Sequence, residues 1–417
     1  MAQPEFFDAL ETRSPEQRER EQMGELATQV AHAQRHSTAF AEILRGVDAQ
    51  AVNSRAALAR LPVTRKTELL ERQKASRASD PFGGFSTLRR GPAMARVYAS
   101  PGPIYEPEGA TRDYWRAGRC LYAAGFRAGE LVHNAFSYHM TPGAFILESG
   151  AHAVGCSVFP AGTGQTEQQL QAITELQPEA YTGTPSFLRI LVEKAQAEGI
   201  DIGSMRKAVV GGEALPPSLR DWFAERGVAV YQSYATADLG LVAYETSARE
   251  GLVVDEGVIV EIVRPGTGEP VPEGEVGELV VTTLNPAYPL IRFGTGDLSA
   301  ILPGACPTGR TAPRIKGWMG RADQTTKVRG MFVHPSQVAD IARRFPQIRK
   351  ARLVVSGEMA NDRMCLRVES AESGEPLREL IAAAVRDVTK LRSEVELVAP
   401  GSLPNDGKVI EDARSYQ

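Results

Sequence analysis

The sequence has few cysteines, no long apolar run and no strong excess of either charge. Its four cysteines lie far apart, without a CxxC pair or a histidine at zinc-ligand spacing, so we interpret them as reduced thiols. No uncharged apolar stretch of roughly 18 residues occurs, and the N-terminus mixes acidic and basic residues where a signal peptide needs an apolar run. These absences argue against membrane and secreted proteins and predict a cytoplasmic one.

The composition is also nearly balanced in charge. With 47 basic and 51 acidic residues the net charge is −4, which provides no overall attraction to nucleic acid or to an anionic membrane. A chain of 417 residues exceeds the roughly 250 to 300 over which a single core keeps growing, so two or more domains are expected. Residues 4 to 75 are predicted to be mainly a helical scaffold, with Ser14 as an N-cap before Pro15.

The loop ASPGPIYEPEG lies between an apolar run and the helix-like pattern TRDYWRAGRCLYAAG. A phosphate-binding loop needs converging backbone N–H groups, which is why such loops are rich in Gly, Ser and Thr. Here Pro101 and Pro103 remove two donors, and the loop has no lysine. Its residues alone therefore favour a structural turn.

Residues 131 to 161 alternate strand-like and helix-like patterns, as in a parallel βαβ unit. Ligands of such sheets bind at the carboxyl ends of the strands. Phe136, Tyr138, His139 and Phe145 are predicted to line a substrate pocket there. His139 could be a base or a substrate ligand, although a lone histidine beside aromatics is more often a hydrogen-bonded wall residue.

Two further strand ends carry suggestive residues. Gly211, Gly212 and Glu213 follow an apolar strand, so the backbone there is open to a flat ligand. The turn YATAD brings an aromatic, a hydroxyl and a carboxylate within five residues. Such a set can stack a base, contact a phosphate and hold a magnesium ion.

The stretch from Pro289 to Pro335 contains RFGTGD and then the basic loop GRADQTTKVRG. Asp297 follows two glycines and is predicted at a tight turn, where its carboxylate can accept two hydroxyl hydrogen bonds as a ribose binder does. A hairpin turn and a solvated charged loop are the alternative interpretations of the two halves.

Together these motifs resemble those of the adenylate-forming acyl-CoA ligase superfamily. GGE, YATAD, IRFGTGD, GRADQTTKVRG and the late SLPNDGKVIED occur in that family's order and approximate spacing. FFDALETR, LPVTRKTEL, TGTPSF and the short chain are more similar to the phenylacetate-CoA ligase group. The resemblance implies an α/β fold: a large N-terminal domain (1–320) with mixed sheets and a β-rich subdomain at about 250–318, and a small mobile α/β domain (321–417).

The resemblance implies a nucleotide site in the large domain. Residues 211–213 would line the adenine site, with Tyr234 against the base. Thr236 would meet the α-phosphate. Asp297 would bind both ribose hydroxyls, and Arg321 would lie near the same sugar.

It also implies the groups that carry the chemistry. Asp238 would hold Mg²⁺, and Ser100 and Gly102 would keep a phosphate-loop role. Asp323 matches the family's hinge, and Lys408 matches the lysine that enters the site for adenylation. A mobile ammonium suits that step because negative charge builds on the oxygens between the acid and the α-phosphorus.

The sequence departs from the family pattern at four places. The loop at Ser100 lacks the usual Ser/Thr/Gly-rich composition, and Asp238 stands where a longer glutamate is usual. Gln324 replaces a second acid after the hinge, and Cys306 stands where relatives can carry two cysteines, so no structural zinc is expected.

Three functions are compatible with these residues. The first is an ATP-dependent ligase that activates an aromatic or compact carboxylic acid as acyl-AMP and transfers the acyl group to CoA; such a ligase could act as a homodimer. The second is a ligase-shaped protein that binds AMP or an acyl ligand but adenylates poorly. The third adenylates an acid and passes the acyl group to a carrier protein or an amine.

Overall fold

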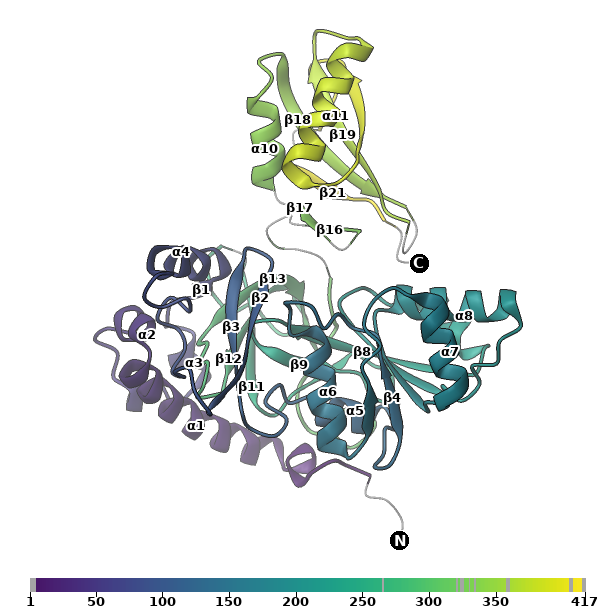
Figure 1. The fold of residues 1–417 in the computed structure, drawn as a ribbon. Coiled ribbons are helices and arrows are strands. Elements are labelled where there is room, and N and C mark those ends of the chain that lie inside the picture. Colours follow the sequence, from purple (N-terminus) through teal and green to yellow (C-terminus); the bar gives the residue numbers. More distant parts are fainter. Residues whose placement is uncertain are drawn as a thin grey trace. The chain divides into compact units, whose positions relative to one another are not determined.

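The computed structural model describes residues 5–264, 266–319, 322, 326–329, 331–333, 335–357, 361–404 and 408–414. The chain divides into two compact units, Met1–Gly320 and Arg321–Gln417 (Figure 1). Each unit has its own sheets and its own buried hydrophobic cluster. The mixed α/β class predicted from the sequence is therefore confirmed.

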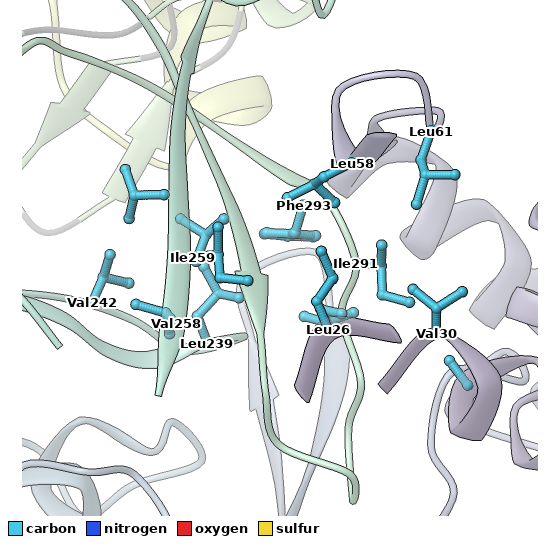
Figure 2. Packing of buried hydrophobic residues seen from close by; sticks show 14 of the residues in the cluster. Leu26, Val30, Leu58, Leu61, Leu239, Val242, Val258, Ile259, Ile291 and Phe293 are labelled. Atoms are coloured by element: carbon cyan, nitrogen blue, oxygen red, sulfur yellow. The ribbon is translucent and has the colours of Figure 1, made fainter. Parts of the chain in front are cut away.

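The first unit begins with a helical segment, as predicted. Ser14 caps the long helix by accepting a hydrogen bond from Gln17 N, with Pro15 as the first helical residue. Leu26 and Val30 from this helix are fully buried. They belong to the same hydrophobic cluster as Ile291 and Phe293, and Figure 2 shows all four side chains in that cluster. The helical elements are η1 (Ala9–Thr12), α1 (Pro15–His36), α2 (Thr38–Ile43), η2 (Ala49–Ala51), α3 (Arg55–Leu58) and α4 (Lys66–Ser76).

A four-stranded sheet and these helices contribute buried residues to the same hydrophobic cluster. Its strands are β1 (Thr64–Arg65), β11 (Val258–Val263), β12 (Gly277–Thr283) and β13 (Phe293–Ser299), in the order β1-β13-β12-β11. Asp297 lies within β13, so the tight turn predicted around it is wrong. The pairing of β12 with β13 shifts register between Glu278 and Val280, and Gly296 takes a positive φ of 72° there. This local irregularity supplies the bend that the two glycines of the motif had suggested.

A nine-stranded sheet forms the other half of this unit, in the order β14-β15-β10-β9-β8-β7-β6-β4-β5. From β5 to β8 the strands are parallel, whereas the pairs from β8 to β14 are antiparallel. Its strands are β4 (Leu131–Asn134), β5 (Ser157–Phe159), β6 (Ala180–Gly183), β7 (Lys207–Val210), β8 (Ala229–Thr236), β9 (Gly240–Tyr244), β10 (Leu252–Val254), β14 (Ile301–Leu302) and β15 (Arg314–Ile315).

Helices connect the parallel strands. The βαβ unit predicted over 131–161 is present as β4, α6 and β5. The helix-like pattern before it yields only one short helix, α5. These helices are α5 (Gly118–Ala123), α6 (Gly143–Val154), α7 (Thr166–Leu176), α8 (Pro185–Glu198) and α9 (Pro217–Ala224). Strands from the β-rich stretch at 250–318 join two different sheets, because β10, β14 and β15 belong to the nine-stranded one.

A separate hairpin carries the Ser100 loop. Strands β2 (Met94–Ser100) and β3 (Ile104–Gly109) pair antiparallel, and residues 101–103 form the exposed turn that the composition predicted. Elsewhere Cys120, Cys156 and Cys306 are buried, and all four cysteines are free thiols. Within the described ranges, no helix combines the length and apolar character needed to cross a bilayer.

The second unit is a small α/β unit with the sheet order β20-β19-β18-β21. Helices α10 (Pro335–Arg343) and α11 (Glu375–Thr389) contribute Ile341, Ile381 and Val385 to its core. Arg414 links the end of β21 to the β16–β17 hairpin by donating to Thr326 Oγ1 and to Lys327 O. Its strands are β16 (Thr326–Val328), β17 (Met331–Val333), β18 (Ile348–Ser356), β19 (Arg363–Ser370), β20 (Glu394–Val398) and β21 (Ile410–Asp412).

Candidate active site

The carboxyl ends of the parallel strands bring several predicted residues to one edge of the nine-stranded sheet. Gly211 and Gly212 follow β7, and Phe136 follows β4. A Cβ atom added at Gly212 would lie 4.0 Å from the Phe136 ring, and one at Gly211 would lie 2.8 Å from Ser233 Oγ. The space at Gly211 is too small for a side chain, so this backbone passes closely beside β8. The two glycines and Phe136 therefore form one continuous surface.

Glu213 has a structural partner at the same edge. Its Oε2 accepts a hydrogen bond of 3.3 Å from Ser186 N, in the first turn of α8. A carboxylate at this position is favourable, because the free N–H groups of a helix N-terminus carry partial positive charge. Glu213 thus holds the strand end of β7 against α8, and its predicted contact with adenine stays a prediction.

Asp297 is held by two aromatic side chains. Tyr234 Oη donates to Asp297 Oδ2 at 2.7 Å, and Trp318 Nε1 donates to Asp297 Oδ1 at 3.1 Å. Each oxygen of the carboxylate thus has a fixed partner, one from β8 and one from the segment after β15. The sequence motifs predict Tyr234 and Asp297 in one site but do not indicate Trp318. The available signal was its position inside the same Pro289–Pro335 stretch, two residues before Gly320.

The turn between β8 and β9 holds Thr236 and Asp238. Thr236 Oγ1 accepts a hydrogen bond of 3.1 Å from Leu239 N and so shapes the turn. Gly240 follows with a φ of 73°, and a Cβ there would lie 2.8 Å from the Trp115 ring. Only glycine fits both the backbone angle and the close approach. Thr236 therefore fixes the start of the turn and Gly240 fixes its end, and Asp238 lies between these two residues in the chain.

Asp238 is buried and forms an ion pair that the sequence analysis did not predict. Lys66 Nζ, at the start of α4, lies 2.9 Å from Asp238 Oδ2, while the side chain of Lys66 remains 39% exposed. The other oxygen, Oδ1, is buried without a hydrogen-bond partner among the described residues. A buried carboxylate oxygen without a donor is costly in free energy, so this atom marks a place where a ligand or cation would be stabilised.

Ser100 donates both of its hydrogen bonds to Glu106, a residue of the same hairpin. Its N–H donates to Glu106 Oε2 at 3.3 Å, and its hydroxyl donates to Glu106 Oε1. Glu106 is fully buried, and this desolvation, with the nearby charge of Asp238, raises its pKa to about 8. Gly102 lies in the exposed turn of the hairpin. Glu106 lies in the loop ASPGPIYEPEG, but the sequence alone predicts no role for it.

The raised pKa of Glu106 predicts a pH dependence of stability. From pH 4.5, the ordinary value, to about 8, folded Glu106 keeps a proton that the unfolded chain loses. The free energy of unfolding should therefore fall as pH rises through this interval. Glu106→Gln should flatten that part of the profile, whereas Glu108→Gln, a buried carboxylate on the same strand, serves as control. Urea unfolding at several pH values measures the effect, and an unchanged profile for Glu106→Gln would contradict it.

Only part of the predicted substrate pocket comes together. Tyr138 and Phe145 form an edge-to-face pair with ring centroids 5.2 Å apart. The Tyr138 hydroxyl donates to Glu148 Oε2 at 2.6 Å and accepts from Asn134 Nδ2 at 2.9 Å, so two neighbouring side chains fix it. Burial raises the pKa of this hydroxyl well above its ordinary value. His139 is exposed, and its described hydrogen bonds are made by its backbone: its N–H donates to Ser137 Oγ and its carbonyl accepts from Thr141 N.

The remaining predicted residues belong to the second unit or lie outside the described residues. Lys408 is exposed and precedes β21 in the small unit. Arg321 and Asp323 are outside the described residues, as are Gln324 and residues 405–407. The ribose contact of Arg321, the hinge role of Asp323 and the adenylation role of Lys408 thus stay predictions.

Comparison with known proteins defines the class. Residues 120–287 match the AMP-binding enzyme family, and residues 330–412 match the AMP-binding enzyme C-terminal domain. The fold is similar to that of 2-hydroxyisobutyryl-CoA ligase in complex with 2-HIB-AMP and CoA, with a TM-score of 0.84 and 26% identity. That similarity covers 100% of this chain and 94% of the other. The fold is thus that of an adenylate-forming CoA ligase, as the sequence motifs predicted.

Sequence relatives narrow the class further. The chain is 33% identical to phenylacetate-coenzyme A ligase of Thermus thermophilus, over 86% of this chain and 87% of the relative. It is 30% identical to phenylacetate-coenzyme A ligase of Pseudomonas putida, over 84% and 83% of the two chains. The chain belongs to the phenylacetate-CoA ligase family of AMP-binding enzymes, which confirms the resemblance found in the sequence.

Proposed function

We propose that this protein activates a carboxylic acid as an acyl-adenylate in its large unit and transfers the acyl group to CoA. Family membership supports the reaction class. The observation that carries the proposal is the carboxylate of Asp297, held by Tyr234 and Trp318 on the chain that bears the Thr236–Asp238 turn. A fixed carboxylate beside an aromatic ring suits a ribose next to its base.

The chemistry has two steps. A carboxylate oxygen of the acid bonds to the α-phosphorus of ATP, and the bond to the bridging oxygen breaks, so pyrophosphate leaves with the electron pair. The sulfur of the CoA thiolate then bonds to the acyl carbon, and AMP leaves. In the first step Gly211 and Gly212 would let the base approach the backbone. The hydroxyl of Thr236 would donate a hydrogen bond to the α-phosphate. Lys408 would meet the charge that develops between the acid and phosphorus.

Asp238 is the residue that would hold Mg²⁺. Its unpartnered, buried Oδ1 fits a hard cation, and magnesium commonly takes one or two carboxylates together with substrate phosphates. When bound, the ion would neutralise charge on the phosphate oxygens. In the described part of the chain no group of three or more His, Cys, Asp or Glu side chains is arranged to hold a metal, so the phosphates would have to supply other ligands.

The acid is proposed to be aromatic or compact. Phe136 faces Gly211 and Gly212, and the Tyr138–Phe145 pair supplies further aromatic surface from the same loop and from α6. Flat rings pack well on such walls, whereas a long flexible chain would gain less from them. The exposed His139 is the weakest member of this set and would act at the entrance. Assembly into a homodimer remains a prediction that mass measurement in solution would test.

Acid-dependent exchange of labelled pyrophosphate into ATP tests the proposal. A panel of aromatic and short-chain acids is incubated with the protein, ATP and labelled pyrophosphate. We expect exchange with at least one aromatic or compact acid, because the first step is reversible. Absence of exchange with every acid would contradict the enzyme function. Full-turnover assays with and without CoA then identify the acceptor, and AMP release that needs an amine or carrier protein instead would overturn CoA transfer.

One observation favours a second function. The donors of Ser100, which a phosphate loop would direct at the nucleotide, are directed at Glu106. A protein that binds AMP or acyl-AMP but adenylates poorly would fit this arrangement. Binding of AMP without exchange in the acid panel would support that function over the first.

A further inference from the structure

Glu106 and Ser100 form a closed pair at the turn of the β2–β3 hairpin. Both are buried, with 0% and 2% of their surface exposed. Ser100 offers two hydrogen-bond donors, its backbone N–H and its hydroxyl, and both donate to the carboxyl group of Glu106. The turn adds few others, because Pro101 and Pro103 have no N–H group. Both hydrogen-bond donors of Ser100 are therefore already used by Glu106.

The Glu106 carboxyl presents two oxygens to these donors, as a phosphate would. Phosphate loops bind anions through backbone N–H and hydroxyl groups that converge on the oxygens. Here an internal carboxyl group receives the same two kinds of donor. The charges of Asp238 and Lys66 also act on the Glu106 carboxyl group: Asp238 raises its pKa and Lys66 lowers it.

Two buried polar atoms, on Asp238 and Tyr288, lack hydrogen-bond partners in the described part of the chain. Asp238 Oδ1 and the Tyr288 hydroxyl are both buried without a hydrogen-bond partner among the described residues. Both residues interact electrostatically with Glu106. Buried polar groups are nearly always paired, so these two unpaired atoms indicate a place that is completed by a ligand. An internal carboxyl group thus takes the donors that the resemblance assigns to the phosphate loop.

We propose that Glu106 is an internal occupant of the phosphate loop and makes this site discriminate a nucleoside monophosphate from a triphosphate. The inference rests on the proposed nucleotide function. The single phosphate of AMP or of an acyl-adenylate would be contacted at Thr236 and would leave Glu106 in place. The β- and γ-phosphates of ATP would require the Ser100 donors, and Glu106 would first have to release them. Glu106 thus lowers ATP affinity and leaves AMP affinity unchanged.

Four variants test this inference by calorimetric titration with ATP and with AMP, in the presence of Mg²⁺ and without any acid. Glu106→Ala should raise ATP affinity about tenfold, because it frees the two Ser100 donors, and should change AMP affinity by less than about threefold. Ser100→Ala alone should leave ATP affinity nearly unchanged. In the double variant it should remove the part of the gain that comes from the hydroxyl, because the backbone N–H remains, and a double-mutant cycle measures that part as coupling.

Glu108→Ala is the matched control. Glu108 is also buried in β3, but its carboxylate accepts hydrogen bonds from Tyr98 and Arg96 instead of Ser100. Its removal should not change the ratio of ATP to AMP affinity. If Glu106→Ala fails to fold, as judged by its melting transition, Glu106→Ser is used instead. It also frees the Ser100 donors from the carboxyl group but keeps a polar side chain at this position.

The outcomes separate the inference from the function on which it rests. AMP binding without a gain in ATP affinity in Glu106→Ala and Glu106→Ser would overturn the role of Glu106 alone. An equal gain for ATP and AMP would also overturn it, because general loosening of the site would explain both. Weaker ATP binding would instead show that Glu106 holds a cation for the phosphates. Failure of the wild-type protein to bind AMP would contradict the proposed nucleotide site itself.

Discussion

Lys408→Ala should slow acyl-adenylate formation by about a thousandfold and leave thioester formation from a pre-made acyl-adenylate nearly unchanged. The ammonium group is proposed to meet charge that develops only in the adenylation transition state, and loss of one such group typically costs two to three orders of magnitude. Thioester formation needs no stabilisation of pyrophosphate departure, so it should not depend on this lysine. Single-turnover measurements of each step, started from ATP with acid or from synthetic acyl-adenylate with CoA, separate the two.

The control for Lys408 lies in the same small unit. Lys390 is an exposed lysine at the C-cap of α11, and Lys390→Ala removes the same charge from the same unit. It should change neither step by more than about twofold, because exposed surface charges contribute little. Equal loss of both steps in Lys408→Ala would mean that the lysine stays in the site throughout. That result would contradict the proposal that the small unit moves between the two steps.

Asp297→Ala should weaken binding of AMP and ATP by about 3 kcal/mol, which corresponds to roughly 150-fold in Kd. Two charge-assisted hydrogen bonds to the ribose hydroxyls would be lost, and such bonds are about twice as strong as neutral ones. The variant also leaves the Tyr234 hydroxyl and the Trp318 N–H without this acceptor. Calorimetric titration with AMP measures the loss directly and needs no catalysis.

Tyr234→Phe separates ribose binding from the support of the carboxylate. It removes the 2.7 Å hydrogen bond to Asp297 but keeps the ring and the charge. Its effect on AMP affinity should therefore be smaller, about tenfold or less. Unchanged AMP affinity in Asp297→Ala, with a normal melting transition, would reject the ribose role. An equal loss in both variants would mean that Asp297 acts chiefly by positioning Tyr234.

Local patterns in the sequence predicted the helices and strands better than the pairing between strands. The Ser14 cap, the helical segment before residue 75 and the βαβ unit after residue 131 all follow from spacing within a few residues, and the structure has them. The prediction of a tight turn at Asp297 was wrong. Glycines permit both a turn and a strand irregularity, and the choice here depends on how β13 pairs with β12. The sequence of β13 contains no information on that pairing by itself.

The order of the motifs by itself determined the family, the α/β class and most of the candidate residues, because each motif is a short stretch whose chemistry is local. Only the tertiary structure decided which groups those residues meet. Lys66 reaches Asp238 across 172 positions, and Tyr234 reaches Asp297 across 63. Such contacts are made by strands and helices that pack together from distant parts of the chain, so spacing cannot reveal them. The pairing of Ser100 with Glu106 spans only six positions, yet it too depended on the fold, because the hairpin turns both side chains inward.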